Sequence, residues 1–286
     1  MAIQLLAKPL VEKTKKQLEA KCKVLKEKDI IPKMQVIYIG DNKASRLYTR
    51  KKKKFCENFG AIVDIIHLPS ETTEKEFLET INNINLDKTT HGCFIQLPVP
   101  TQLEHLDIGE LISPQKDVDG FHAENLRHLM RNSNEELYFV PCTPGGIMAL
   151  LSHYQIPVEG KNVVIVGRSM IVGKPLSLLM TNHNATVTVC HSKTNNLREI
   201  TRSADIIVSA VGKPRYLDAS YINNEKDQVV IDVGINHDQD GILCGDINFN
   251  EVEPLVYAIT PVPGGVGPLT VLYLAQNLLQ AAEKNI

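Results

Sequence analysis

Residues 45–54 contain a tyrosine and a lysine at a spacing suited to proton transfer. Tyr48 and Lys52 are four residues apart, so they lie on one face of the helix predicted for residues 45–59. A lysine that turns inward beside a tyrosine could move protons, whereas a run of cations such as residues 50–54 ordinarily forms a solvated face or a patch for acidic ligands. Periodicity alone does not select one lysine, but the pairing with Tyr48 favours Lys52.

Gln96 ends a predicted buried strand, residues 92–96, and a proline-rich loop follows it directly. Its amide therefore lies at the carboxyl end of a sheet strand, where α/β proteins form ligand sites. A neutral amide at this point could hold a lysine without fixing its charge. A hydrogen bond from Gln96 to the proline-rich loop is an equally good interpretation.

The segment Asp117-Val118-Asp119-Gly120 resembles the first residues of a calcium-binding loop. It lacks the third early ligand, and its twelfth position is His128 instead of glutamate, so we predict no metal site. Asp119, beside a glycine turn, could accept hydrogen bonds from the edge of a bound heterocycle, or it could cap the turn.

A second group of polar residues surrounds the turn Gly167-Arg168-Ser169, which follows the apolar strand predicted for residues 163–166. Gly167 permits a tight turn into a helix that begins near residues 173–175, and free amides at a helix start attract phosphate. The glycine spacing departs from the usual Gly-x-Gly-x-x-Gly. Another kind of phosphate-binding domain, or a purely structural turn, is therefore an alternative to dinucleotide binding.

The next predicted strand, residues 186–190, ends where an NAD-binding domain usually has an acidic residue for the ribose 2′-hydroxyl. This chain has His191-Ser192-Lys193 there, within a stretch from residue 160 to 198 that contains no acidic residue. A carboxylate would repel a 2′-phosphate, whereas Arg168, Ser192 and Lys193 could donate hydrogen bonds or charge to it. The pattern favours NADP as the cofactor.

Two α/β domains are needed to position these residues. Helices and strands alternate up to residue 96 and again from residue 160, which is the rhythm of parallel sheets with crossover helices. We predict a first domain at residues 1–140, to which a final helix at residues 269–286 returns, and a Rossmann-like second domain at residues 141–268. The turn-prone segment 141–146 lies at the boundary. In the second domain, Gly212 and Gly234 each follow a strand, and we expect them to let a flat cofactor approach the sheet.

Bulk composition excludes several classes of partner. With 286 residues, a net charge of -2 and a pI near 6.5, the chain has no global attraction to nucleic acid or anionic membrane, and we predict neither partner. The N-terminus lacks the pattern of a signal or transit peptide, so we expect a cytoplasmic protein. The six cysteines are scattered singly and are expected to be reduced thiols.

In their order along the chain, six motifs resemble those of the bifunctional methylenetetrahydrofolate dehydrogenase/methenyltetrahydrofolate cyclohydrolase family. They are Ser45-x-x-Tyr48-x-x-x-Lys52, Gln96-Leu97-Pro98-Val99-Pro100, Lys116-Asp117-Val118-Asp119-Gly120-Phe121, Pro141-Cys142-Thr143-Pro144, Gly167-Arg168-Ser169-x-x-Val172-Gly173-x-Pro175 and Thr260-Pro261-Val262-Pro263-Gly264-Gly265-Val266-Gly267-Pro268. The ordered series is highly specific and spans essentially the whole chain. One departure is Asn248, where the family usually has Asp.

The resemblance implies an enzyme that oxidises 5,10-methylenetetrahydrofolate with NADP and then hydrolyses the methenyl product to 10-formyltetrahydrofolate. Lys52 would be the catalytic lysine, oriented by Gln96. Tyr48 would line and stack on the folate, and Asp119 would hold its pterin ring. The implied fold has two α/β domains facing across a cleft, in a homodimer.

The resemblance also assigns residues of the second domain. NADP would be bound by Gly167, Arg168, Ser169 and Ser192, with Ile235 near the cofactor, and the folate would be bordered by Pro263, Gly264 and Gly265. The cations of residues 50–54 could attract the acidic tail of a polyglutamylated folate.

Two other functions are considered, one a related enzyme and one a protein of a different class. A dehydrogenase without cyclohydrolase activity is disfavoured because Tyr48, Lys52 and Gln96 are all present. A nucleic-acid-binding module built on residues 50–54 is disfavoured by the balanced net charge and the absence of interleaved aromatic residues.

Overall fold

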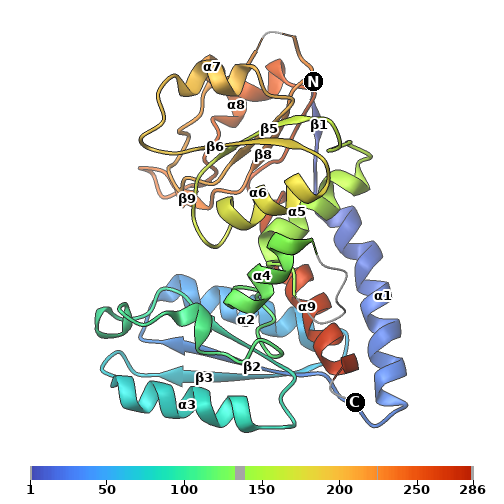
Figure 1. The fold of residues 1–286 in the computed structure, drawn as a ribbon, viewed down its shortest axis with the longest axis vertical. Helices are drawn as coiled ribbons and strands as arrows, with labels where there is room; N and C mark the ends of the chain where they lie inside the picture. The colour runs from blue at the N-terminus through green and yellow to red at the C-terminus, as the bar shows by residue number, and fades with distance from the viewer. Residues whose placement is uncertain (1, 133–138, 224, 285–286) are drawn as a thin grey trace. The chain divides into compact units, whose positions relative to one another are not determined.

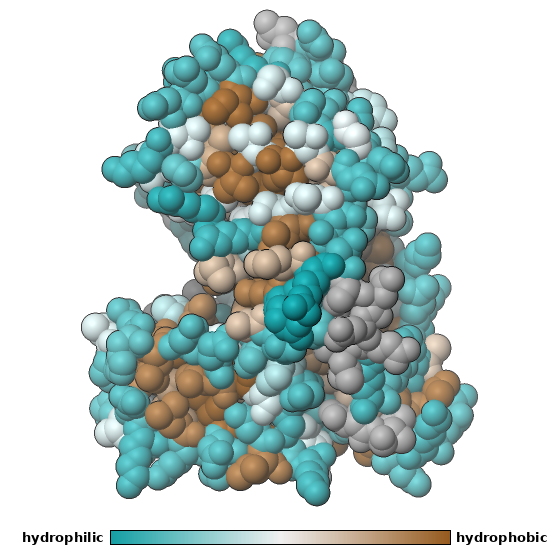
Figure 2. All heavy atoms as spheres, in the orientation of Figure 1, coloured by the Kyte–Doolittle hydropathy of each residue, from teal (hydrophilic) through white to brown (hydrophobic). Residues whose placement is uncertain are grey.

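The structure is a computed structural model that describes residues 2–132, 139–223 and 225–284 (Figure 1). The chain forms two compact units. The three-stranded unit consists of Lys13–Cys142 and Val271–Ile286, and the six-stranded unit consists of Met1–Glu12 and Thr143–Thr270. Three helices have residues in both units: α1 (Lys8–Lys26), α5 (Cys142–His153) and α9 (Gly267–Lys284). In Figure 2, hydrophilic side chains cover most of the visible face of each unit.

The three-stranded unit has a parallel sheet in the order β3-β2-β4. Its strands are β2 (Lys33–Ile39), β3 (Ile62–Leu68) and β4 (Gly92–Gln96), and its helices include α2 (Lys43–Glu57), α3 (Glu74–Leu86) and α4 (Ala123–Arg131). Short 3-10 turns lie at Thr101–Leu103 and Ile108–Glu110. Thr73 and Glu76 form a capping box that starts α3, and Phe77 and Ile81 then pack with Ile37 of β2 in a buried cluster.

The six-stranded unit has an all-parallel sheet in the order β1-β11-β8-β7-β5-β6. Its strands are β1 (Ile3–Gln4), β5 (Asn162–Val166), β6 (Thr186–Cys190), β7 (Ile206–Ser209), β8 (Val229–Asp232) and β11 (Ala258–Ile259). The other elements are α6 (Gly173–Asn182), α7 (Leu197–Arg202), α8 (Phe249–Val252), 3-10 turns at Ala219–Tyr221 and Glu253–Leu255, and an antiparallel pair, β9 (Asn236–His237) with β10 (Leu243–Cys244).

The order of this sheet determines where a ligand can bind. From β5 the chain first adds β6 on one side and then β7 on the other, so the strand order reverses between β5 and β7. Helices α7 and α8 lie on one face of the sheet, and α5 and α6 lie on the other (Figure 1). The carboxyl ends of β5 and β7 therefore form the switch point at which open α/β sheets bind nucleotides. The predicted α/β class with a Rossmann-like second part is confirmed.

The turn predicted at residues 141–146 is wrong, because α5 already begins at Cys142. Pro144 lies in the first turn of that helix, where a missing N–H has no cost. Gly146 serves helix packing: a Cβ atom on it would lie 2.8 Å from Cβ of Leu269 in α9. The sequence also predicted a final helix at residues 269–286. The structure has α9 at Gly267–Lys284, and residues 285–286 lie outside the described part of the chain.

Candidate active site and dinucleotide site

The start of α2 is fixed to the loop that follows β4. Asn42 caps the helix by accepting a hydrogen bond from the Ser45 N–H at 3.0 Å. The Ser45 hydroxyl then donates to the Leu97 carbonyl at 3.3 Å. These bonds hold the first turn of α2 beside the carboxyl end of β4, where Gln96 lies.

Lys52 points into the three-stranded unit and is only 8% exposed. Its Nζ lies 3.3 Å from Oε1 of Gln96 and 3.9 Å from the centre of the Phe94 ring. The Gln96 amide also donates through Nε2 to the Leu97 carbonyl at 2.9 Å. Both interpretations of Gln96 are therefore present at once: one end of its amide binds the proline-rich loop, and the other accepts from the lysine.

Phe94 was not singled out from the sequence, although a signal exists. It precedes Gln96 by two residues, and alternate residues of a strand share a face. A cation over an aromatic face is stabilised by about 0.5–2 kcal/mol, more when water is excluded. Phe94 and Gln96 together give the buried ammonium group two uncharged partners.

Tyr48 lies one helical turn before Lys52 and is half-buried, and burial raises the pKa of its phenol. The neighbouring cations of α2 differ in their surroundings. Lys53 donates to the Val63 carbonyl at 2.7 Å and pairs with Glu57 at 3.4 Å. Lys51 lies 5.8 Å from the Tyr48 ring centre. The basic run is thus only in part a solvated face.

Asp119 is half-buried beside the start of α5. Its carbonyl accepts from the Cys142 N–H at 3.3 Å. Burial raises the pKa of the Cys142 thiol well above its usual range, and the Asp119 carboxylate adds to this shift while the Lys52 ammonium opposes it. Cys142 therefore lies within electrostatic reach of both Asp119 and Lys52.

The neighbours of Asp119 have structural roles. Asp117 is buried and accepts hydrogen bonds from the N–H groups of Gly120 and His122 and from the Asn125 amide. Burial raises its pKa to about 6. Lys116 donates to three carbonyls at the end of α3. These two residues hold the loop from which Asp119 projects.

The turn after β5 is as tight as the sequence predicted. Gly167 has φ +137°, and a Cβ atom on it would lie 2.4 Å from the Ala210 carbonyl oxygen beyond β7. A Cβ atom on Gly173 would lie 2.1 Å from the Gly167 carbonyl oxygen. The Ser169 hydroxyl accepts from the Val172 N–H at 3.2 Å, and Ser169 O accepts from the Lys174 N–H. Helix α6 therefore starts directly at the switch point.

The remaining predicted residues of the six-stranded unit are exposed or lie in loops. Arg168, Ser169 and Ser192 are exposed, and Ile235 is 45% exposed. Gly212 has φ +66° and open space where a Cβ atom would be. Tyr48, Lys52, Gln96 and Asp119 all belong to the other unit. The site residues thus form two separate sets, one in each unit.

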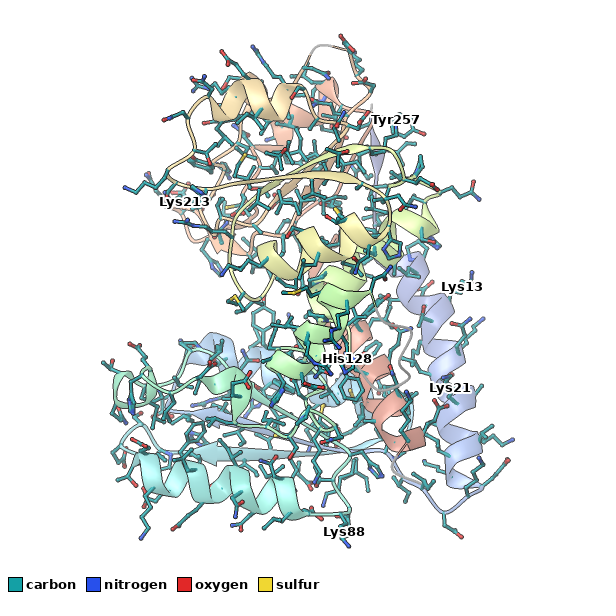
Figure 3. The ribbon with its side chains drawn as sticks, in the orientation of Figure 1. Lys13, Lys21, Lys88, His128, Lys213 and Tyr257 are labelled. Atoms are coloured by element: carbon teal, nitrogen blue, oxygen red, sulfur yellow. The ribbon has the colours of Figure 1, made fainter. Side chains whose placement is uncertain are left out.

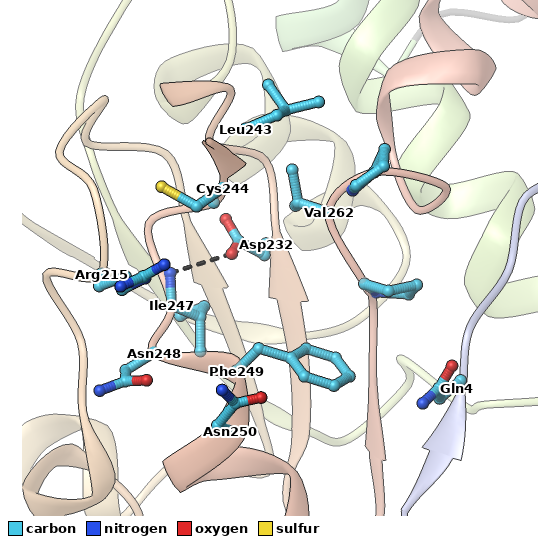
Figure 4. A pocket seen from close by; sticks show the side chains of 13 residues that line it. Gln4, Arg215, Asp232, Leu243, Cys244, Ile247, Asn248, Phe249, Asn250 and Val262 are labelled. Atoms are coloured by element: carbon cyan, nitrogen blue, oxygen red, sulfur yellow. Dashed lines mark hydrogen bonds between the residues drawn. The ribbon is translucent and has the colours of Figure 1, made fainter. Parts of the chain in front are cut away.

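The loop after β11 carries Pro263, Gly264 and Gly265. The Gly264 carbonyl accepts from the Ala7 N–H at 2.9 Å, and the Gly265 N–H donates to Pro261 O at 2.8 Å. Pro263 also lines a pocket of about 380 Å³ together with Arg215, Asp232 and Phe249 (Figure 4). This pocket lies within the six-stranded unit.

Gly234 has a packing reason that the sequence did not predict. A Cβ atom on Gly234 would lie 2.3 Å from Oδ1 of Asp246, so the glycine makes room for a carboxylate of the protein, and its role toward a cofactor stays a prediction. Asn248, the departure noted above, donates through its amide to the Glu251 carboxylate at 2.7 Å. An aspartate at 248 could not donate that bond.

Comparisons with known proteins agree over nearly the whole chain. The family model described as "Tetrahydrofolate dehydrogenase/cyclohydrolase, catalytic domain" matches residues 5–119, and the one described as "Tetrahydrofolate dehydrogenase/cyclohydrolase, NAD(P)-binding domain" matches residues 141–286. The chain is 46% identical to the "Bifunctional protein FolD" of Halalkalibacterium halodurans over 283 residues, which cover 99% of both chains.

Solved structures give the same result. The FolD methylenetetrahydrofolate dehydrogenase/cyclohydrolase of Campylobacter jejuni is 40% identical, with a TM-score of 0.95 over 100% of both chains. The methylenetetrahydrofolate dehydrogenase-cyclohydrolase of Trypanosoma brucei, solved with NADP and an inhibitor, is 32% identical, with a TM-score of 0.92 over 99% of this chain and 98% of that one.

Proposed function

The chain belongs to the tetrahydrofolate dehydrogenase/cyclohydrolase family, and on that basis we propose how its residues carry out two reactions. The protein is a bifunctional enzyme. It oxidises 5,10-methylenetetrahydrofolate to 5,10-methenyltetrahydrofolate with NADP, and it hydrolyses that product to 10-formyltetrahydrofolate. The family, the activity and the cofactor predicted from the sequence are confirmed.

Lys52 is the group that moves protons during hydrolysis. The methenyl cation shares its charge between two folate nitrogens, and water must lose a proton to attack it. Ring opening then requires a proton on the leaving nitrogen. The observation that carries this role is the placement of Lys52: its ammonium is buried against Gln96 and Phe94, and among the described residues no carboxylate forms an ion pair with it.

Tyr48 and Asp119 bind the folate. Tyr48 is half-buried one turn from Lys52, so its ring can stack on a flat substrate whose one-carbon bridge faces the lysine. Asp119 can accept hydrogen bonds from the amino-pyrimidine edge of the pterin, which presents donors. Hydride transfer then needs positioning of the one-carbon bridge more than an acid or base.

The residues around β5 fit NADP. Gly167 brings the backbone within contact of Ala210 at the switch point where α6 starts, and Gly212 leaves open space there. Ser169 and Ser192 would bind phosphate oxygens, and the exposed Arg168 guanidinium would bind the 2′-phosphate. Ile235 would lie near the nicotinamide, and the cofactor would supply the hydride acceptor for the first reaction.

Further proposals rest on the family. The three-stranded unit carries folate binding and catalysis, the six-stranded unit binds NADP, and Pro263, Gly264 and Gly265 border the folate. We propose a homodimer in the cytoplasm, and exposed cations of α2 such as Arg50 and Lys54 that attract polyglutamylated folate tails. Within the described residues, no helix is both long and apolar enough to cross a membrane.

A spectrophotometric assay tests the function. With methylenetetrahydrofolate and either NADP or NAD, the absorbance of NAD(P)H and that of the methenyl intermediate are followed together. We expect Lys52→Met to lose cyclohydrolase activity by at least about 10²-fold, the range for general acid–base catalysis. Lys54→Met, on the same helix but exposed, is the matched control with a monoglutamate substrate. Normal hydrolysis by Lys52→Met would refute the assignment.

A further inference from the structure

Asp246 is a buried carboxylate that the reaction does not use, and it is fully satisfied by hydrogen bonds. Its exposed fraction is 0%. It accepts from the Ser209 hydroxyl at 3.3 Å, the Val211 N–H at 2.7 Å, the Gly212 N–H at 3.3 Å, the Lys213 N–H at 2.9 Å and the Asn236 amide at 2.9 Å. A charged acceptor with this many donors is among the strong interactions of a protein interior.

The donors come from two segments at the carboxyl edge of the sheet. Residues 209–213 end β7 and form the loop beside Gly167, because Gly167 packs on the Ala210 carbonyl. Asn236 directly follows Ile235, in the segment that leaves β8. In Figure 3 the Lys213 side chain projects outward, and the backbone N–H of Lys213 donates to Asp246. One carboxylate thus fixes both segments on which NADP is proposed to rest.

The chain makes room for this carboxylate at a neighbouring glycine. A Cβ atom on Gly234 would lie 2.3 Å from Oδ1 of Asp246, although Gly234 does not have a positive φ. A second carboxylate, that of Asp232, also lies against a glycine: a Cβ atom on Gly245 would lie 1.8 Å from Oδ2 of Asp232. Asp232 accepts from the N–H of Asp246 at 2.9 Å and so holds its neighbour in place.

We propose that Asp246 is a positioning residue for the dinucleotide: it holds the loop of Val211, Gly212 and Lys213 and the Ile235–Asn236 segment in the geometry that NADP binding requires. Gly212 is the glycine of this loop with a positive φ, +66°, and its N–H is one of the groups that Asp246 holds. An uncharged amide at 246 would present an N–H group toward some of these donors, leave them unpaired and release the loop.

The enzyme supplies its own control, since hydrolysis of added methenyltetrahydrofolate needs no dinucleotide. We would measure the Kd for NADPH by its fluorescence, the KM for NADP and the cyclohydrolase rate in wild type, Asp246→Asn and Asn236→Ala. The matched control is Asp205→Asn, which alters a carboxylate that accepts from the Asn162 N–H at the opposite end of β7.

Asp246→Asn is expected to raise the Kd for NADPH and the KM for NADP at least tenfold, with a cyclohydrolase rate within twofold of wild type. Asn236→Ala, which loses one bond, should shift both constants about threefold, and Asp205→Asn should shift neither. Unchanged NADPH affinity in Asp246→Asn, or an equal loss of both activities, would overturn the proposal. If Asp246→Asn does not fold, an unchanged Kd in Asn236→Ala overturns it.

The inference rests on the proposed dinucleotide site, and the two can fail separately. A wild-type protein that does not bind NADPH would refute the proposed site before any variant is compared. A wild type that binds NADPH, together with Asp246 variants that bind it equally well, would leave the site intact and refute only the role of Asp246.

Discussion

The Nζ atom of Lys52 lies 3.3 Å from Oε1 of Gln96. The partner of the lysine is thus a neutral amide, although a glutamate carboxylate could accept the same hydrogen bond. An amide accepts a hydrogen bond from the ammonium but does not hold its proton by charge. This setting is compatible with the proton-transfer role that we propose for Lys52 in the second reaction.

Gln96→Glu should therefore lower cyclohydrolase activity by at least about 10-fold near neutral pH, because an ion pair favours the protonated lysine. The pH–rate profile of hydrolysis should move to higher pH, since more alkali is needed to remove the proton. Gln96→Met is the control that removes the hydrogen bond without adding charge, and its profile should keep its position. Coincident profiles for Gln96→Glu and wild type would contradict this account.

Arg168→Ala should raise the KM for NADP about 10-fold or more and leave the KM for NAD within about twofold, because only NADP carries the 2′-phosphate. Initial rates with each cofactor give both constants. Arg198→Ala removes a guanidinium that lies 5.2 Å from the Tyr221 ring centre in the same unit, and it should affect neither constant. Equal rises for both cofactors would argue against 2′-phosphate recognition.

Gly167→Ala should weaken NADPH binding and lower the free energy of unfolding. The new methyl group would meet the Ala210 carbonyl oxygen at 2.4 Å in addition to the strain of φ +137°. Gly160→Ala separates the steric effect from the torsional strain. Gly160 also has a positive φ, +72°, but a Cβ atom added to it would meet no described atom within 4 Å. We expect a cost of about 1–2 kcal/mol at Gly160 from the torsion alone and a larger one at Gly167. Urea titration measures both, and similar costs would exclude the steric effect.

The contribution of Asp232 to the stability of the protein should fall as pH rises from about 4 to 7. Burial raises the pKa of Asp232 to about 7, and the nearby Asp246 carboxylate also raises it. An unfolded aspartate has a pKa near ~3.9, so in this window the folded state keeps a proton that the unfolded state releases. The free energy of unfolding then decreases with pH, by at most about 1.4 kcal/mol per pH unit for one group.

Denaturant titrations at pH 5 and pH 8 test this dependence. The fall between the two values should be smaller in Asp232→Asn than in wild type, because the amide cannot ionise. Asp117 has a pKa raised to about 6 by burial, so some of the fall should persist in the variant. Curves for Asp232→Asn and wild type that fall by the same amount would show that Asp232 is not the source.

The sequence by itself determined the local elements and the family. Strand β4 has its predicted bounds, Gly92–Gln96, and helix α6 begins at Gly173, within the range predicted for its start, because apolar periodicity and glycine turns act over a few residues. The ordered motifs indicated the family that the comparisons then confirmed.

Tertiary structure decided the partners of those motifs. Strand alternation puts Phe94 on the same face as Gln96, but the contact of Phe94 with Lys52 and the segments tied by Asp246 depend on pairings between distant parts of the chain. The same limit explains the wrong turn predicted at Gly146 and the unpredicted packing role of Gly234. Both glycines have a packing reason supplied by residues far away, Leu269 and Asp246, and a glycine in the sequence looks the same whether it serves a turn, a ligand or a neighbour.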